Sequence, residues 1–327
     1  MSTSSNSSKS PNSPNTAAWL LEPKAHPFQL QHAPLWEPAE NEILVRNHAV
    51  AINPVDGSLQ TKAWWPMEYP TILGQDVAGE VVQVGPQVTR FRPGDRVAGL
   101  AVGMATKRDQ DHAFQAYTIL QTNMASELPD TLSYEAAAVI PLGLSTAACG
   151  LFQDTHLALR VGSNAIQLAV AAGYEVVTTA SPRNFDHATR LGAGRVFDYR
   201  SPTVVDELVA WLEGKTLVGA MDCIGFAATP MTVEVVRRSQ GAKFVATVKG
   251  GFEAPDGVTV KSVFGTTLKD NAVGKAIYED FLPRALKAGS FTPAPEPLVA
   301  GHGLHSIQAA VDRQAQGTSA QKIVVVL

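Results

Sequence analysis

The chain shows two patterns of apolar and polar positions, which meet near residue 134. Between residues 17 and 134, short apolar runs such as 43–45 and 77–84 are separated by glycine, proline and aspartate. Short runs that are bounded by turn-forming residues are typical of strands joined by tight turns. The first part of the chain therefore predicts an irregular β-rich domain.

The pattern changes at Ser133, a helix-capping residue that precedes strong helix formers. Beyond it, helical periodicity alternates with short apolar strands, which predicts a parallel sheet covered by helices. The expected helices are 162–172, 184–191 and 204–212, and the expected strands are 175–180, 196–197 and 217–222.

The last part of the chain follows a proline-rich segment, 291–298. Residues 307–315 predict a helix, and the apolar run 323–327 predicts a buried strand. We expect this strand to return to the β-rich domain.

Composition narrows the class of protein. A length of 327 residues favours two domains, and the 26 basic and 30 acidic residues give a net charge of −4 without a basic block, so nucleic acid is not an expected partner. Two cysteines, Cys149 and Cys223, are too few for a disulfide framework or a structural zinc lobe.

The sequence also predicts the compartment. Residues 1–15, rich in serine, asparagine and proline, fit neither a secretory signal nor a mitochondrial one, and we expect a disordered tail. No apolar run is expected to reach the roughly 18 residues of a membrane span. We expect a cytoplasmic protein without a membrane partner.

Seven short motifs occur in a characteristic order, at residues 51–56, 73–79, 93–97, 113–117, 143–147, 181–184 and 322–325. Together they identify a resemblance, over residues 17–327, to the medium-chain dehydrogenase/reductase superfamily, close to the fungal trans-acting enoyl reductases and zinc-binding-dehydrogenase-like proteins of polyketide clusters. The resemblance implies an α/β fold with four segments: a tail (1–16), a GroES-like catalytic domain (17–135), a Rossmann-like cofactor domain (136–285) and a return to the catalytic domain (286–327).

The zinc site of the metal-dependent branch is not expected here. That branch needs thiolate, imidazole and further anionic ligands around one ion. The matching positions hold Asn53 and the pair Gln75 and Asp76, and neutral amides do not hold Zn²⁺. We interpret His112 and His156 as loop histidines, and we expect no bound metal.

The first strand and glycine-rich turn of the cofactor domain are shortened. Dinucleotide binding uses backbone N–H groups at a helix N-terminus, and glycines normally precede that helix. Here only residues 157–160 stand before Val161 and Gly162. Either this segment is a stunted strand with Gly162 as its close-approach glycine, or the sequence derives from a damaged or mis-spliced gene.

The end of the next strand predicts the preferred dinucleotide. An NAD site would place an acidic residue there, whereas Ser181, Arg183 and Asn184 offer donors to the 2′-phosphate of NADPH. Ser181 and Asn184 could also cap the following helix. The resemblance implies that Tyr199 contacts the adenosine, although it could instead be a surface aromatic that closes a turn.

The substrate side is predicted from a second group of residues. The resemblance places Val55, Asp56 and Ser58 beside the nicotinamide, although some relatives have lysine at the position of Ser58. Asn53 and Asp56 could instead only fix their own turn. Ser58, Thr146 or backbone N–H groups would stabilise an oxyanion.

Two further features belong to this side. The resemblance implies that a loop containing Thr318 and Ser319 touches the nicotinamide side. Trp64, Trp65 and Phe264 would suit an apolar cleft for a conjugated acyl chain or a quinone, or they form ordinary core.

These features predict an NADPH-dependent oxidoreductase that reduces an activated C=C bond, enone or quinone. Its substrate would be a small molecule or a carrier-bound acyl chain such as a polyketide intermediate of secondary metabolism. A polyketide synthase would be a partner, and the assembly would be a monomer or a dimer. Hydride transfer requires alignment rather than a nucleophile. The alternative is a non-catalytic or impaired member of the fold that has lost dinucleotide binding, and a zinc alcohol dehydrogenase ranks third.

Overall fold

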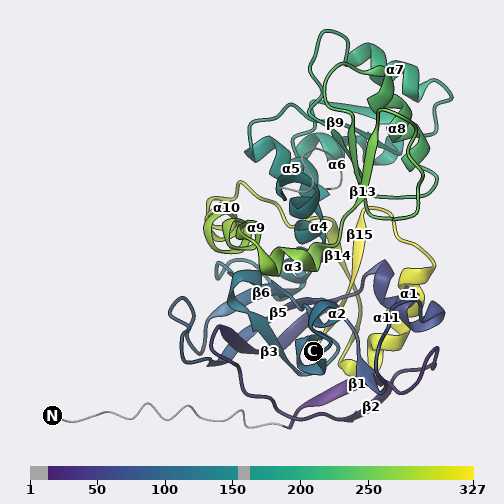
Figure 1. Ribbon diagram of the computed structural model, residues 1–327. Helices are drawn as coiled ribbons and strands as arrows, with labels where there is room; N and C mark the ends of the chain where they lie inside the picture. The colour runs from purple at the N-terminus through teal and green to yellow at the C-terminus, as the bar shows by residue number, and fades with distance from the viewer. Residues whose placement is uncertain (1–13, 154–162) are drawn as a thin grey trace. The chain divides into compact units, whose positions relative to one another are not determined.

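The computed structural model describes residues 14–153 and 163–327. The chain divides into two units, Met1–Pro141 with Tyr278–Leu327 and Leu142–Ile277. Strands dominate the first unit and alternate with helices in the second (Figure 1). We call them the β-rich domain and the α/β domain, and the expected combination of these two domain types is confirmed.

The β-rich domain is built on one large, mainly antiparallel sheet with the strand order β14-β15-β3-β5-β6-β8, to which β7 adds by pairing with β3. A smaller sheet has the order β2-β1-β4. The strands are β1 (Thr16–Leu20), β2 (Gln29–His32), β3 (Glu42–Ala51), β4 (Thr71–Ile72), β5 (Asp76–Val84), β6 (Arg96–Leu100), β7 (Tyr117–Gln121), β8 (Ala125–Glu127), β14 (Glu296–His302) and β15 (Gln321–Val326).

The last strand returns to the first domain, as expected. β15 pairs antiparallel with β3, where Val324 faces Ala51, and parallel with β14. Its β-branched residues Ile323, Val324 and Val325 are fully buried, which favours a central strand. The C-terminal segment therefore completes a sheet that begins about 280 residues earlier in the chain.

Strands β3 and β5 approach closely at Gly79. A Cβ atom at this position would lie 2.1 Å from the carbonyl oxygen of Arg46. No side chain larger than hydrogen fits against a neighbouring backbone at this distance. Glycine at this position is therefore a requirement of the sheet.

Short helices lie between the strands of the β-rich domain. The hydroxyl of Ser133 caps α3 by accepting a hydrogen bond from the N–H of Ala136 at 3.2 Å, as the sequence predicts. The helices are α1 (Pro54–Lys62), α2 (Gly103–Thr106), α3 (Tyr134–Ala138), α10 (Leu282–Ala288) and α11 (Ile307–Ala315), with shorter helical turns at Asp109–Asp111, Thr122–Met124 and Leu304–Ser306.

The α/β domain contains two separate parallel sheets. One joins β9 (Val177–Ala180) to β10 (Arg195–Asp198), and the other has the order β11 (Ala220–Asp222), β12 (Phe244–Thr247), β13 (Thr259–Ser262). Within residues 142–153 and 163–277, no strand links β9 to β11. The predicted strand at 157–160 lies outside the described residues.

Helices pack on these sheets around a core that includes Val177, Phe197, Leu208, Val236 and Val245. The predicted helices are confirmed as α5, α6 and α7, with small shifts at their ends. The helices are α4 (Pro141–Phe152), α5 (Ser163–Ala171), α6 (Phe185–Arg190), α7 (Val204–Trp211), α8 (Thr229–Arg238) and α9 (Ala272–Lys275), with shorter turns at Pro182–Asn184, Gly265–Asp270 and Ala276–Phe281.

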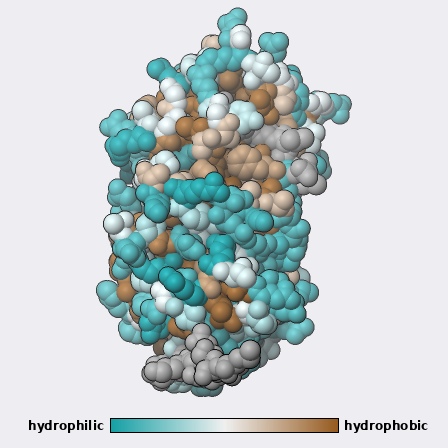
Figure 2. All heavy atoms as spheres, turned by 90° about the vertical axis from the view of Figure 1, so that its left-hand side faces the viewer, coloured by the Kyte–Doolittle hydropathy of each residue, from teal (hydrophilic) through white to brown (hydrophobic). Residues whose placement is uncertain are grey.

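The α/β domain leaves large apolar side chains in solvent. Ile224 and Phe226 are 72% and 74% exposed, more than the other exposed large apolar residues, and Val170, Tyr174 and Tyr199 add to this set. Figure 2 shows apolar residues at the surface of the α/β domain, in the upper part of the view, and further apolar areas on the β-rich domain. The β-rich domain also exposes large apolar residues, among them Leu30 and Trp64, to a smaller degree.

One apolar stretch is longer than the sequence analysis expected. Tyr134–Phe152 is long and apolar enough, by length and composition, to cross a membrane, so that expectation is wrong on this point. About two thirds of its apolar window is buried inside the protein, as is usual for core helices.

Candidate functional site

The start of α1 carries a buried polar cluster. Asn53 precedes the helix and Pro54 occupies its first turn, where the missing N–H of proline is harmless. The N–H of Asn53 donates to Oδ2 of Asp56 at 2.7 Å, so Asp56 does fix its own turn. The side-chain Nδ2 of Asn53 instead donates to Oδ2 of Asp76 at 2.8 Å, which links α1 to the first residue of β5.

A lysine completes this cluster. Lys322 of β15 places its Nζ 2.5 Å from Oδ2 of Asp76, and both side chains are buried, with exposures of 11% and 0%. The same ammonium donates to the carbonyl oxygen of Val139 at 3.2 Å. In the sequence, Lys322 stands out only as part of a motif, and its contact with Asp76 is not apparent because 246 positions separate the two residues.

Burial controls the charge of Asp56. Desolvation, and next the neighbouring carboxylate of Asp76, raise the pKa of Asp56 to about 7, although the hydrogen bond from Asn53 opposes the shift. The Oδ1 atom of Asp56 is buried and has no hydrogen-bond partner. Gln75 lies close enough to lower this pKa, yet its Nε2 makes no hydrogen bond.

The positions that hold zinc in the metal-dependent branch do not form a zinc site here. The described residues contain no group of three or more His, Cys, Asp and Glu side chains that could hold a metal ion. Asn53 and Asp76 are bonded to each other, and an ammonium lies against Asp76. A cation this close to the carboxylate opposes the binding of a metal ion.

Ser58 lies on α1, half-buried, one turn after Pro54. The indole Nε1 of Trp64 donates to its Oγ at 2.9 Å, and Trp64 and Trp65 pack edge to face with 5.6 Å between ring centroids. Within the described chain, the hydroxyl hydrogen of Ser58 has no acceptor. Trp64 is half exposed, and Val55 is half-buried on the same helix.

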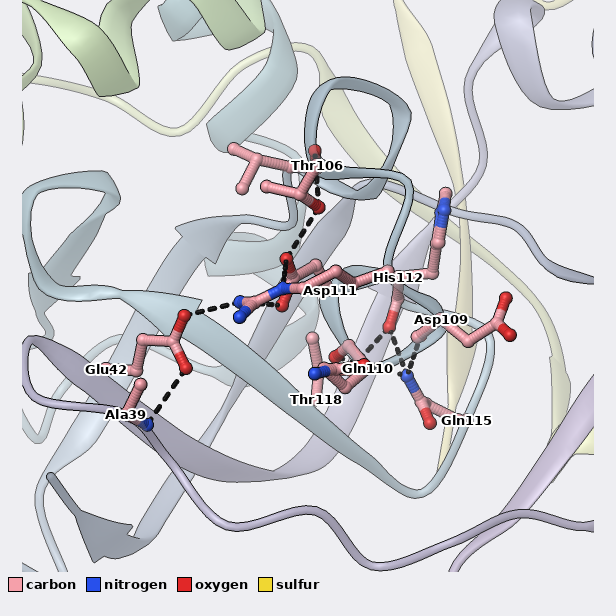
Figure 3. A network of polar contacts seen from close by, with 11 residues as sticks. Ala39, Glu42, Thr106, Asp109, Gln110, Asp111, His112, Gln115 and Thr118 are labelled. Carbon is pink, nitrogen blue, oxygen red and sulfur yellow. Dashed lines mark hydrogen bonds and ion pairs between the residues drawn. The ribbon is translucent and has the colours of Figure 1, made fainter. Parts of the chain in front are cut away.

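A second polar network fixes the loop before β7 (Figure 3). Arg108 bridges Glu42 of β3 and Asp111, and Thr106 donates to Asp111 at 2.6 Å. The carbonyl of His112 accepts hydrogen bonds from Gln115 and Thr118. These bonds brace a loop against the sheet.

His112 is the loop histidine that the sequence analysis expected, since it lies outside every helix and strand. Its ring is buried, and desolvation lowers its pKa to about 4. A Cβ atom on Gly103 would lie 2.2 Å from this ring, which explains the glycine there. His156 lies outside the described residues.

In the α/β domain, the end of β9 presents polar side chains to solvent. Ser181 and Asn184 occupy N-cap positions, but neither makes a side-chain capping bond, so the capping interpretation is wrong. Arg183 is exposed, and no ion pair within the described residues includes it. No acidic residue follows β9 directly.

Tyr199 lies beside this strand end. Its N–H donates to the carbonyl of Ala180, the last residue of β9, at 3.4 Å. Its ring is 49% exposed, with the guanidinium of Arg200 at 5.6 Å from the ring centroid. The pairing of β9 with β10 thus brings Tyr199 close to the end of β9.

Asp222, at the end of β11, organises a loop that the sequence analysis did not single out. Its Oδ1 accepts the N–H groups of Ile224 and Gly225, both at 2.9 Å, and its Oδ2 accepts the hydroxyls of Thr229 and Thr247. The only sequence signal was an acidic residue at the end of a predicted strand. In parallel sheets, ligands bind at this edge of the strands.

The remaining predicted residues are dispersed. Thr146 is half-buried on α4, and Gly265 approaches it so closely that an added Cβ would lie 3.3 Å from its hydroxyl. Thr318 and Ser319 are exposed between α11 and β15, and the Thr318 hydroxyl donates to the carbonyl of Gln321 at 2.7 Å. Gly162 lies outside the described residues.

Comparisons with known proteins agree with this architecture. An alcohol dehydrogenase GroES-like domain matches residues 39–140, and a zinc-binding dehydrogenase domain matches residues 161–282. A crystal structure of an alcohol dehydrogenase superfamily protein from Novosphingobium aromaticivorans superimposes with a TM-score of 0.79 at 24% identity, covering 96% of this chain and 99% of that one. This likeness concerns the fold.

Two curated relatives are closer in sequence. The zinc-binding alcohol dehydrogenase domain-containing protein cipB of Emericella nidulans is 77% identical over 313 residues, 96% of this chain and 98% of the relative. The trans-enoyl reductase himH of Aspergillus japonicus is 37% identical over 339 residues, 95% of this chain and 97% of the relative.

The lengths of these two alignments differ. The himH alignment is longer than this 327-residue chain, so it contains positions for which this chain has no residue. The cipB alignment has no such excess. The short form of the chain therefore has a counterpart in a close relative.

Proposed function

Because this chain belongs to the medium-chain dehydrogenase/reductase superfamily and is an oxidoreductase by that membership, we propose that it uses NADPH to reduce an activated C=C bond, enone or quinone. Bound NADPH would supply the hydride. The chain itself would bind the dinucleotide, orient the acceptor and stabilise the charge that develops on its carbonyl oxygen.

The observation that carries the NADPH assignment is the end of β9. Ser181 makes no side-chain cap, Arg183 is exposed, and no carboxylate stands where an NAD site would place one. A guanidinium can grip a phosphate through two parallel hydrogen bonds. These side chains suit the 2′-phosphate that distinguishes NADPH from NADH.

On the substrate side, Ser58 is the donor that the structure favours. Trp64 fills an acceptor site of its oxygen, which leaves the hydroxyl hydrogen for a carbonyl oxygen of the substrate. A carrier-bound acyl chain from a polyketide synthase is the proposed substrate class, because the himH relative is a trans-enoyl reductase.

A second candidate function is supported by the divided sheet. If no strand occupies the place between β9 and β11, backbone donors at the pyrophosphate position are lost, and the chain would be a member of the fold that does not bind a dinucleotide. This candidate predicts a stable protein without cofactor affinity.

Titration with NADPH and NADH, followed by calorimetry and tryptophan fluorescence, distinguishes the two candidates. We expect saturable NADPH binding that is tighter than NADH binding. Equal affinities would contradict the role of Arg183, and no binding of either dinucleotide would favour the second candidate.

A further inference from the structure

The cluster at the start of α1 contains a cation that belongs to the protein. The ammonium of Lys322 lies 2.5 Å from Oδ2 of Asp76, and that oxygen also accepts the Nδ2 of Asn53. Asn53 in turn precedes α1, and its N–H is held by Asp56. A continuous chain of polar contacts thus runs from β15 through β5 to the start of the helix.

The buried carboxylate of Asp76 needs a positive charge beside it. Asp76 is fully buried, and a buried carboxylate without a counter-ion is strongly unfavourable. In the metal-dependent branch, a metal ion provides positive charge at the matching positions. Here the donor set does not suit zinc, and the positive charge comes from β15.

Two further polar atoms lie buried in this cluster. The Oδ1 of Asp56 and the Nε2 of Gln75 are both buried without hydrogen-bond partners. The ammonium of Lys322 is the cation in contact with the buried carboxylate of Asp76.

We propose that Lys322 replaces the metal ion as the internal cation of this cluster, and that it positions α1 through Asp76 and Asn53. It is a positioning residue, because it acts on the helix through two other side chains. The proposal does not depend on NADPH binding or on catalysis.

The backbone of β15 allows the side chain to be tested separately. The carbonyl of Ile323 accepts the N–H of Ile52 at 2.9 Å, and β15 pairs with β3 at Val324–Val326. These bonds are retained when only the side chain of Lys322 is changed. Effects of such changes on α1 therefore report the ammonium.

The test is hydrogen exchange of the α1 amides, residues 55–62, in the full chain. Lys322→Met keeps most of the apolar stem and removes the charge, so we expect exchange to accelerate by more than about tenfold. Lys322→Arg keeps the charge and should remain near the parent. Lys62→Met, an exposed lysine on α1 itself, is the matched control and should have no effect.

A double variant tests the coupling. Adding Asp76→Asn to Lys322→Met removes the stranded carboxylate, so protection of α1 should recover in part, and this variant should fold even if Lys322→Met alone does not. Unchanged α1 exchange in Lys322→Met, an equal loss in Lys322→Arg, or a further loss in the double variant would overturn the proposal.

Discussion

The two domains differ in how completely the strands of their sheets are paired. In the β-rich domain, a strand from the far end of the chain completes the main sheet by pairing on both of its edges. In the α/β domain, β9 and β11 each have a neighbour on one side only, within the residues that the structure describes. The more exposed apolar side chains, Ile224 and Phe226, lie in the second domain.

This contrast shows which features of a superfamily member can persist independently. The ends of β9 and β11 carry ordered polar side chains, although no strand among the described residues joins the two sheets. A binding residue needs only its own strand end, whereas a central strand supplies hydrogen bonds to both neighbours. Four experiments test this difference between the domains.

The largest effect should come from restoring the α/β sheet. Insertion of a superfamily-like strand and Gly/Ser-rich turn between residues 156 and 161 should raise stability, by about 1–3 kcal/mol for each buried backbone group that gains a partner. It should also tighten NADPH binding by at least about tenfold, because backbone donors reach the pyrophosphate. Thermal unfolding and calorimetry measure the two effects.

The two readouts of this insertion have different meanings. A graft that stabilises the fold without tightening binding would place the defect in the sheet alone. If the parent already binds NADPH at micromolar concentrations and turns over an enone, the residues at 157–162 must form a working substitute, and the comparison fails.

The next effect concerns the intact sheet. Gly79→Ala should destabilise the β-rich domain by about 3 kcal/mol, because the new methyl group collides with the carbonyl of Arg46. Gly194→Ala is the control, since its Cβ would meet ordinary contacts of 3.6 Å or more. Urea unfolding compares them, and equal midpoints would show that the β3–β5 contact is not tight.

A third effect is the response of the β-rich domain to acid. Because the pKa of His112 is lowered in the folded protein, its contribution to the free energy of unfolding is complete above pH 6.5. This contribution is lost as the pH falls through about 4. Asp56, with its raised pKa, acts in the opposite direction: its contribution is complete below 3.8 and is lost as the pH rises through about 7. The two partly cancel in the parent.

Asp56→Asn removes the contribution of Asp56 to the pH dependence of stability and leaves that of His112. We expect the variant to lose roughly 2–3 kcal/mol more than the parent between pH 6.5 and 4, as measured by urea unfolding at each pH. Identical pH profiles for parent and variant would mean that Asp56 has an ordinary pKa in the folded protein.

The smallest effect on stability is expected at the end of β9. Arg183→Ala should leave the unfolding midpoint unchanged, because the side chain is exposed. It should narrow the preference for NADPH over NADH by about 1.5–3 kcal/mol. Arg190→Ala, also exposed on the nearby α6, is the control that should leave the preference intact.

Local features of the fold could be predicted from the sequence. Ser133 followed by alanines gave the start of α3, and the β-branched run near the C-terminus gave β15. Both features depend on residues that are adjacent in the sequence. The capping role of Ser181 was wrong, because a cap also requires side-chain geometry that residue type alone does not determine.

The candidate site was less accessible to prediction. Lys322 and Asp76 meet only because β15 crosses back to the first domain, and no local pattern announces that a lysine at a strand start will be buried. Asp222 was missed for a similar reason, since its four hydrogen bonds come from three different segments. Contacts between distant segments appear only once the topology is known.

The position of β15 also has a consequence for the folding of the protein during translation. In the sequence, the α/β domain stands between the two segments of the β-rich domain. It therefore leaves the ribosome before β15, the strand that completes the earlier sheet. During translation, residues 49–51 of β3 have no partner on this edge until β15 is made, whereas residues 42–46 pair with β7. A nascent chain stalled before residue 321 would therefore expose this unpaired edge. Chaperones or neighbouring polypeptides could bind to it by strand pairing.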